Sequence, residues 1–89
     1  MELTVTVHDE AGLHARPAAA FVQAAAGYKA AVRISNLRTG KGPVSAKSII
    51  AVMGLGVRQG DEVRLHAEGE DAAQALQALA GLLQGERTE

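Results

Sequence analysis

Apolar and polar residues alternate along several stretches of the chain. Leu3, Val5 and Val7 are separated by Thr4 and Thr6, a period of two that is typical of a half-buried strand. Alternation of this kind predicts strands over residues 3–8, 28–35 and 62–67. Residues 43–45 are predicted to form a short further strand, third in chain order, that pairs back at a sheet edge, where Pro43 is suited. The inward positions of the second and fourth strands are Val32, Ile34, Val63 and Leu65.

The intervening stretches favour helices. Two helices are predicted over residues 17–26 and 46–55. Gly27 can end the first and Gly56 the second. A third helix follows Glu70 or Asp71, either of which can cap it. Its apolar stripe consists of Ala72, Ala75, Leu76, Leu79 and Leu83, which is the spacing of a helix with one buried face. The last four residues, 86–89, are expected to be frayed.

The resulting order, βαββαβα, indicates an α+β fold. Three helices are expected on one face of a four-stranded, mainly antiparallel sheet, which is an open-faced sandwich. The other face then carries polar side chains, namely Thr4, Thr6, Arg33 and Arg64. A chain of 89 residues has room for one modest core, so residues 1–89 are predicted to form a single domain.

Composition narrows the possible functions. Hydrophobic residues make up 47% of the chain but aromatic residues only 2%, so the core must consist of alanine and aliphatic side chains. The net charge of −1 argues against nucleic acid as a main partner. The chain has no cysteine, no apolar run of membrane-spanning length and no recognisable secretory signal. A soluble cytoplasmic protein is expected, with no metal site, because the histidines have no cluster of further ligands.

Candidate chemistry is concentrated at the start of the first predicted helix. His14 and Arg16 flank this start, and Pro17 suits the first helical turn. The free N–H groups and the dipole of a helix N-terminus favour an anion. An imidazole, a guanidinium and these amides together suggest the handling of a phosphoryl group. The alternative is that His14 is a solvated cap or a packing residue.

Three segments carry a resemblance to a known family. They read Gly12-Leu13-His14-Ala15-Arg16-Pro17-Ala18, then Ser45-Ala46-Lys47-Ser48-Ile49-Ile50 with its continuation to Val57, and Gln59-Gly60-Asp61-Glu62-Val63. The first resembles the active-site signature of HPr, the histidine-containing phosphocarrier family of the bacterial phosphoenolpyruvate-dependent sugar phosphotransferase system. The resemblance extends from about Leu3 to Leu83 and implies the same open-faced sandwich.

The resemblance implies that the protein relays a phosphoryl group rather than acting as an independent enzyme. It also implies that no cofactor is needed. His14 would accept a phosphoryl group at Nδ1 from phosphorylated Enzyme I and pass it to a histidine of a IIA protein or domain. Arg16 would pair with the phosphoryl oxygens, because its planar fork suits them. Backbone amides of Ala15 and Arg16 would add donors, and Pro17 would fix the turn.

The second segment implies regulation and docking. Ser48 resembles the serine that HPr kinase/phosphorylase modifies in some bacteria, and it is also a plausible N-cap. Ile49, Ile50 and Met53 are expected to form an exposed docking patch for Enzyme I and IIA proteins, while Val52 and Leu55 belong to the core. Transient docking accounts for this patch, so a monomer is expected.

Two departures from the family pattern stand out. Ala11 replaces a Ser or Asn that many members carry, and the loop over residues 36–42 is about three residues longer than usual, with Arg38 and Lys41 added. The alternatives are a regulatory paralogue such as Crh, which lacks the active histidine, a carrier of the nitrogen-related branch, and an enzyme with a phosphohistidine intermediate. His8 and His66 are assigned to solvent-facing strand positions without chemistry-bearing neighbours.

Overall fold

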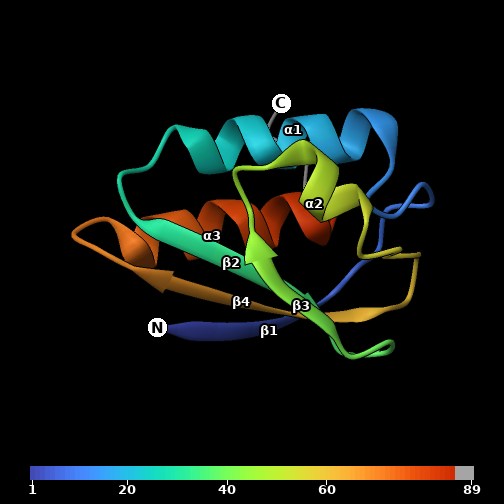
Figure 1. Ribbon diagram of the computed structural model, residues 1–89. Helices are drawn as coiled ribbons and strands as arrows, with labels where there is room; N and C mark the ends of the chain where they lie inside the picture. The colour runs from blue at the N-terminus through green and yellow to red at the C-terminus, as the bar shows by residue number, and fades with distance from the viewer. Residues whose placement is uncertain (86–89) are drawn as a thin grey trace.

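The computed structural model describes residues 1–85 and has the predicted element order (Figure 1). The four strands are β1 (Glu2–Thr6), β2 (Ala31–Asn36), β3 (Lys41–Ser45) and β4 (Glu62–Glu68). The three helices are α1 (Ala15–Ala26), α2 (Ile49–Met53) and α3 (Ala72–Leu83). The expectation for residues 86–89 lies outside the described residues.

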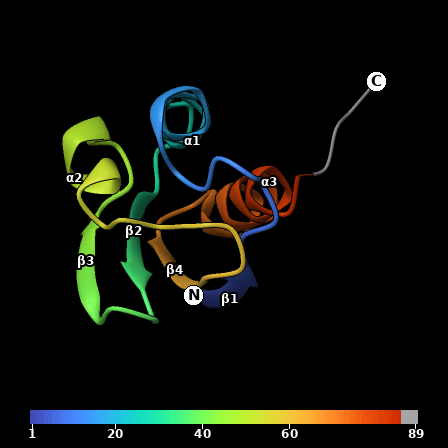
Figure 2. The same ribbon diagram turned by 90° about the vertical axis from the view of Figure 1, so that its right-hand side faces the viewer.

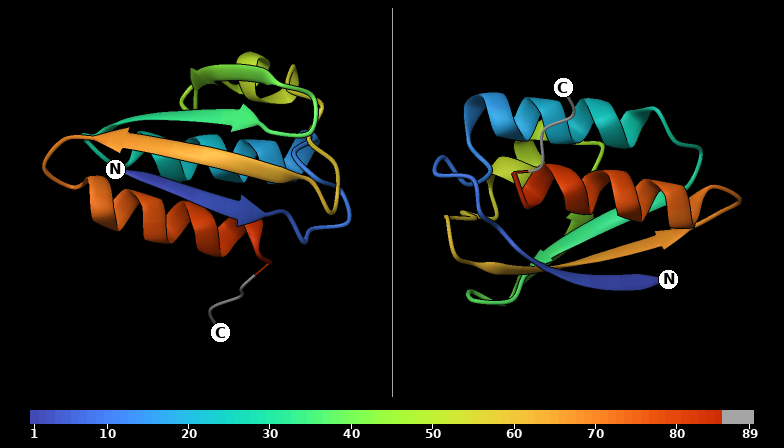
Figure 3. Two further views of the ribbon diagram at one scale, coloured as in Figure 1. Left: turned by 90° about the horizontal axis from the view of Figure 1, so that it is seen from below. Right: turned by 180° about the vertical axis from the view of Figure 1, so that it is seen from behind.

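The strands form one antiparallel sheet in the order β1-β4-β2-β3. Leu65 pairs with both Leu3 and Ile34, and Val63 pairs with Val5, so apolar side chains of β1, β4 and β2 stand in register on one face. All three helices cover one face of this sheet, and the view onto the opposite face shows the strands uncovered (Figure 3). The predicted α+β open-faced sandwich is therefore confirmed.

The core lies between the sheet and the helices. Val32, Ile34, Val63 and Leu65 are buried on the strands, as the alternation predicts. The helices add small and aliphatic side chains around a single aromatic ring: Ala18, Phe21, Ala25, Val52, Ala72, Ala75, Leu76, Leu79, Ala80 and Leu83. Short alanine side chains let the helix backbones approach the sheet closely, because protein interiors are close-packed.

The second strand begins later than predicted, and Asp71 explains why. The N–H groups of Lys29 and Ala30 donate to the Asp71 carboxylate at 2.9 and 2.8 Å, so this segment forms a turn rather than a strand. Asp71 occupies the N-cap position of α3 but makes no side-chain cap bond to it. Asp71 is thus the N-cap by position, one of the two residues predicted, but its carboxylate joins the start of α3 to the residues before β2 instead of bonding to the helix.

The second helix is shorter than predicted. Residues 46–48 form a turn instead of its first part, because the Ala46 N–H continues the pairing with β2 by donating to the Val32 oxygen. Ser48 is the N-cap, as expected, and its hydroxyl accepts from the Ala51 N–H at 3.3 Å. The helix stops at Met53, and Gly54 rather than Gly56 is its C-cap.

Other boundaries shift by one or two residues, the ordinary uncertainty of element ends. Helix α1 begins at Ala15 and strand β3 at Lys41. Leu3 is more exposed than its alternation suggests, with 39% of its surface accessible, because it lies on an edge strand. None of the helices within residues 1–85 combines the length and hydropathy needed to cross a bilayer.

Candidate functional site

His14 lies at the exposed N-terminus of α1. It is the N-cap residue, with an extended backbone at φ −116° and ψ 152°, and its side chain makes no cap hydrogen bond. Its ring is therefore not used to stabilise the helix. Pro17 follows in the first turn, where its missing N–H leaves no helical hydrogen bond unmade.

The first turn of α1 offers free donors beside the ring. Within residues 1–85, no carbonyl or side chain accepts from the N–H groups of Ala15 and Arg16. Arg16 is exposed and pairs with no carboxylate in the part of the chain that the structure describes. A helix of twelve residues adds the positive end of its dipole. The structure thus brings the sequence-predicted imidazole, guanidinium and amides together.

Ala15, directly after His14, has a left-handed backbone at φ +46°. This conformation costs a non-glycine residue about 1–2 kcal/mol. Backbone strain of this kind persists only where surrounding contacts impose it, and it is concentrated at functional sites. The strained peptide adjoins both His14 and the free amides, so the local geometry is imposed by the rest of the fold.

Contacts with residue 57 hold the loop that precedes His14. The buried Leu13 donates its N–H to the Val57 carbonyl at 3.2 Å. Gly12 has φ +60°, and a Cβ there would overlap the same carbonyl oxygen and lie 2.9 Å from Arg58 Cα. Sequence reasoning did not single out Val57, because its contribution is a backbone carbonyl that leaves no mark in the sequence.

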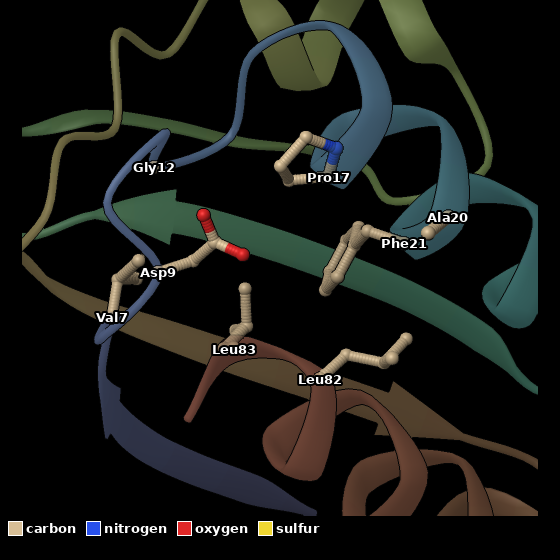
Figure 4. Close-up of a pocket in the computed structure, with 8 residues that line it drawn as sticks. All are labelled: Val7, Asp9, Gly12, Pro17, Ala20, Phe21, Leu82 and Leu83. Carbon is tan, nitrogen blue, oxygen red and sulfur yellow. The ribbon is translucent and has the colours of Figure 1, made fainter. Parts of the chain in front are cut away.

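A small hollow of about 90 Å³ lies between this loop, α1 and α3. Figure 4 shows the Asp9 carboxylate pointing toward it, with Pro17 and Phe21 on one side and Leu82 and Leu83 on the other. Its volume equals about three waters, well below the about 300 Å³ at which small-molecule pockets begin. His14 does not line it. The exposed His14 thus lies outside this hollow.

Helix α2 lies beside α1 on the same side of the sheet (Figure 2). Ile50 is 82% exposed, and Ile49 and Met53 are each 39% exposed, whereas Val52 and Leu55 are buried. The exposure and burial expected of these five residues are confirmed. Their docking role is a separate question.

The prediction that His66 has no chemistry-bearing neighbour is wrong. His66 is only half-exposed, and its Nε2 lies 3.0 Å from Glu68 Oε1, with Glu2 at 3.8 Å from Nδ1. The hydrogen bond with His66 holds the pKa of the Glu68 carboxyl below its ordinary value. His8 is exposed and follows β1 rather than lying in it.

An open-faced sandwich that presents a histidine on its surface, at a helix N-terminus, is built as a group carrier. Such a protein meets donor and acceptor macromolecules in turn instead of enclosing a substrate. Residues 1–85 match the family described as "PTS HPr component phosphorylation site". The chain belongs to this HPr family, the phosphocarriers of the phosphotransferase system, which relay a phosphoryl group without catalysing the transfer as independent enzymes.

Similarity to individual proteins extends over nearly the whole chain. The phosphocarrier protein HPr of Haloferax volcanii is 49% identical over 83 residues, which cover 93% of this chain and 92% of that protein. A crystal structure of HPr from Bacillus anthracis has a TM-score of 0.89 and 42% identity, covering 94% of this chain and 96% of that one. The multiphosphoryl transfer protein of Haemophilus influenzae is 43% identical over 76 residues, which are 85% of this chain but 15% of that longer protein.

Proposed function

We propose that His14 accepts a phosphoryl group from phosphorylated Enzyme I and passes it to a histidine of a IIA protein or domain. The observation that carries the proposal is the exposed, uncapped His14 ring at the start of α1, beside the free N–H groups of Ala15 and Arg16. A ring nitrogen of His14 attacks phosphorus as the phosphorus–nitrogen bond of the donor breaks. In the second step a histidine nitrogen of the acceptor attacks the same phosphorus as its bond to His14 breaks, which loads the acceptor and regenerates the carrier.

Arg16 and the two backbone amides stabilise the transferred group. Phosphoryl transfer depends mainly on positioning and on charge stabilisation. Arg16 is exposed and lies two residues after His14, and its guanidinium fork binds two phosphoryl oxygens. The amides of Ala15 and Arg16 donate to the third, and Pro17 keeps the first turn in place.

The exposed patch formed by Ile49, Ile50 and Met53 serves as the docking surface for Enzyme I and for IIA acceptors. Its exposure on α2, beside α1, supports this role, because exposed apolar patches are typical of protein contact sites. Methionine is flexible and adapts to differently shaped partners, which suits a carrier that must meet at least two.

Ser48 is the proposed site of regulation by HPr kinase/phosphorylase. It lies at the edge of the docking patch, immediately before Ile49. A phosphate on its hydroxyl retains an oxygen acceptor for the Ala51 N–H and is compatible with the adjacent helix end. The fold then tolerates the modification, while the added charge opposes burial of the neighbouring apolar residues against a partner.

Intact mass after incubation with Enzyme I and phosphoenolpyruvate tests the proposed relay. We expect a gain of one phosphate, about 80 Da, that mild acid removes, because phosphohistidine is labile in acid and phosphoserine is not. Adding sugar-type and nitrogen-type IIA proteins then shows which class discharges the carrier. No mass gain with an Enzyme I that is active on another HPr would refute the proposal.

Replacing Arg16 with alanine is expected to slow loading of His14 about tenfold to a hundredfold, since a charge-assisted hydrogen bond to a phosphoryl group contributes about 1.5–3 kcal/mol. Single-turnover transfer from phosphorylated Enzyme I measures this rate. Arg16→Lys is the matched control and should recover part of it, because lysine restores the charge but not the fork. An unchanged rate in Arg16→Ala would exclude Arg16 as a phosphoryl ligand.

Replacing Ser48 with aspartate is expected to weaken binding to Enzyme I about tenfold, a free-energy change of about 1.4 kcal/mol, because a charge enters an apolar contact. Calorimetric titration gives the dissociation constant. Thr4→Asp adds the same charge on the open face of the sheet and should bind like the parent protein. Equal weakening by both substitutions would indicate a general charge effect and not an interface at Ser48.

A further inference from the structure

A polar cluster of three side chains, two of them buried, lies where β2 ends and β4 begins. Asn36 is fully buried and Asp61 is 6% exposed. Arg38 Nε donates to Asp61 Oδ1 at 2.7 Å, and Asn36 Nδ2 donates to Asp61 Oδ2 at 3.4 Å. We call Asn36, Arg38 and Asp61 the polar cluster. Arg38 lies between β2 and β3, in a connection of residues 37–40 that is shorter than the loop predicted over residues 36–42, because Asn36 belongs to β2 and Lys41 to β3.

The polar cluster binds the backbone of residues 55–58, which we call the strap. Asn36 Nδ2 donates to the Leu55 carbonyl at 3.1 Å and Arg38 Nη2 to the Gly56 carbonyl at 3.3 Å. The Arg58 N–H donates to Asp61 Oδ2 at 3.0 Å. Three of the four strap residues are therefore held by side chains of the cluster.

The fourth strap residue, Val57, holds the loop that carries His14. Its carbonyl accepts from the Leu13 N–H, and Gly12 packs against the same carbonyl and against Arg58 Cα. The Leu13 N–H lies one residue before His14. A continuous set of contacts thus runs from the polar cluster through the strap to the histidine loop.

Asp61 is suited to this role because it remains charged. Burial alone would raise the pKa of its carboxyl, but the hydrogen bond and charge of Arg38, with the bond from the Arg58 N–H, hold that pKa below its ordinary value. Hydrogen bonds to a charged group are stronger than neutral ones. The strap is therefore fixed more firmly than by backbone contacts alone.

We propose that the polar cluster is a positioning device for phosphoryl transfer, in which Asp61 and Arg38 fix the Val57 carbonyl and, through Leu13, the placement of His14. This inference rests on the proposed function of His14. The strap also follows α2 directly after Gly54, so the cluster sets the docking patch relative to the histidine. Misplacement of a reacting group by about 1 Å costs up to about a hundredfold in rate.

Asp61→Asn tests the proposal, because asparagine keeps the shape of the side chain and removes its charge. We expect loading of His14 to slow about tenfold at a temperature well below unfolding. We also expect faster hydrogen exchange at the Leu13 N–H than in the parent protein. The Ala46 N–H, which donates to the Val32 carbonyl and contacts neither the cluster nor the strap by a hydrogen bond, should keep its exchange rate and so reports general loosening.

Asp71→Asn is the matched control. Like Asp61, Asp71 carries a carboxylate that accepts from the backbone, in this case from two N–H groups. It lies near the C-terminal end of α1, whereas His14 lies at the N-terminal end of this helix, which is about 18 Å long. The control should lose global stability without slower loading or faster Leu13 exchange. Arg38→Gln changes a partly exposed side chain and provides the test if Asp61→Asn does not fold.

Each outcome is decisive. Slower loading with faster Leu13 exchange, found in Asp61→Asn or Arg38→Gln but absent in Asp71→Asn, supports the proposal. Parent-like loading in the cluster variants, or equal slowing in all three, would overturn it and leave the cluster a purely stabilising feature. Failure of the parent protein to accept any phosphoryl group would refute the proposed function instead. Unchanged Leu13 exchange in the cluster variants would refute the positioning contact in either case.

Discussion

Replacing His14 with alanine will abolish the phosphoenolpyruvate-dependent mass gain and leave the fold intact. The His14 side chain is exposed and makes no cap hydrogen bond, so its removal breaks no side-chain hydrogen bond or ion pair within residues 1–85. Substitutions at such positions change the free energy of unfolding by no more than about 0.5 kcal/mol. Intact mass and thermal unfolding of the variant, measured side by side, separate loss of the nucleophile from loss of the fold.

The two other histidines of the chain supply matched controls. His8 is exposed, and His66 is hydrogen-bonded to Glu68 on the sheet. His8→Ala and His66→Ala are each expected to gain one phosphate as the parent protein does. A mass gain that persists in His14→Ala and disappears in His66→Ala would move the phosphoryl site to the sheet and reject the assignment of His14.

Local patterns were sufficient to predict most of this fold. Alternation placed Val32, Ile34, Val63 and Leu65 correctly in the core, and helical spacing did the same for the stripe on α3, because burial of one face depends on periods of two and 3.6 residues. The errors arose where a distant residue decides the local structure. Asp71 turns residues 29–30 away from a strand by accepting their N–H groups from a position more than 40 residues along the chain.

The candidate site likewise has one part that the local sequence predicted and another part that it did not. The residues around His14 form a contiguous motif, so the sequence predicted their proximity directly. The left-handed Ala15 backbone and the Val57 carbonyl that supports Leu13 were not predicted, since neither depends on the identity of a neighbouring side chain. Arg38 and Asp61 are 23 residues apart, and no local pattern connects them. Sequence therefore predicts the candidate reactive group, whereas the structure was needed to show the contacts of the loop that precedes it.

Replacing Gly12 with alanine is expected to destabilise the protein by about 2–5 kcal/mol. A left-handed alanine costs about 1–2 kcal/mol, and Gly12 has φ +60°. The added Cβ would overlap the Val57 carbonyl oxygen and crowd Arg58 Cα at 2.9 Å, and overpacking of this kind costs a further about 1–3 kcal/mol. To relieve the overlap, the Val57 carbonyl must move away from the Leu13 N–H, so phosphoryl loading should also fall. Urea unfolding measures the stability change.

Gly40→Ala separates the conformational cost from the cost of the contact. Gly40 has φ +76°, also in the left-handed region, but it lies outside the strap, and a Cβ there meets no heavy atom within 4 Å in the described structure. The control should therefore show the conformational cost alone, about 1–2 kcal/mol, with phosphoryl loading close to that of the parent protein. The difference between the two variants then measures the contact between the histidine loop and the strap. Equal losses of stability in both variants, with loading unaffected in Gly12→Ala, would mean that this contact does not hold His14 in position.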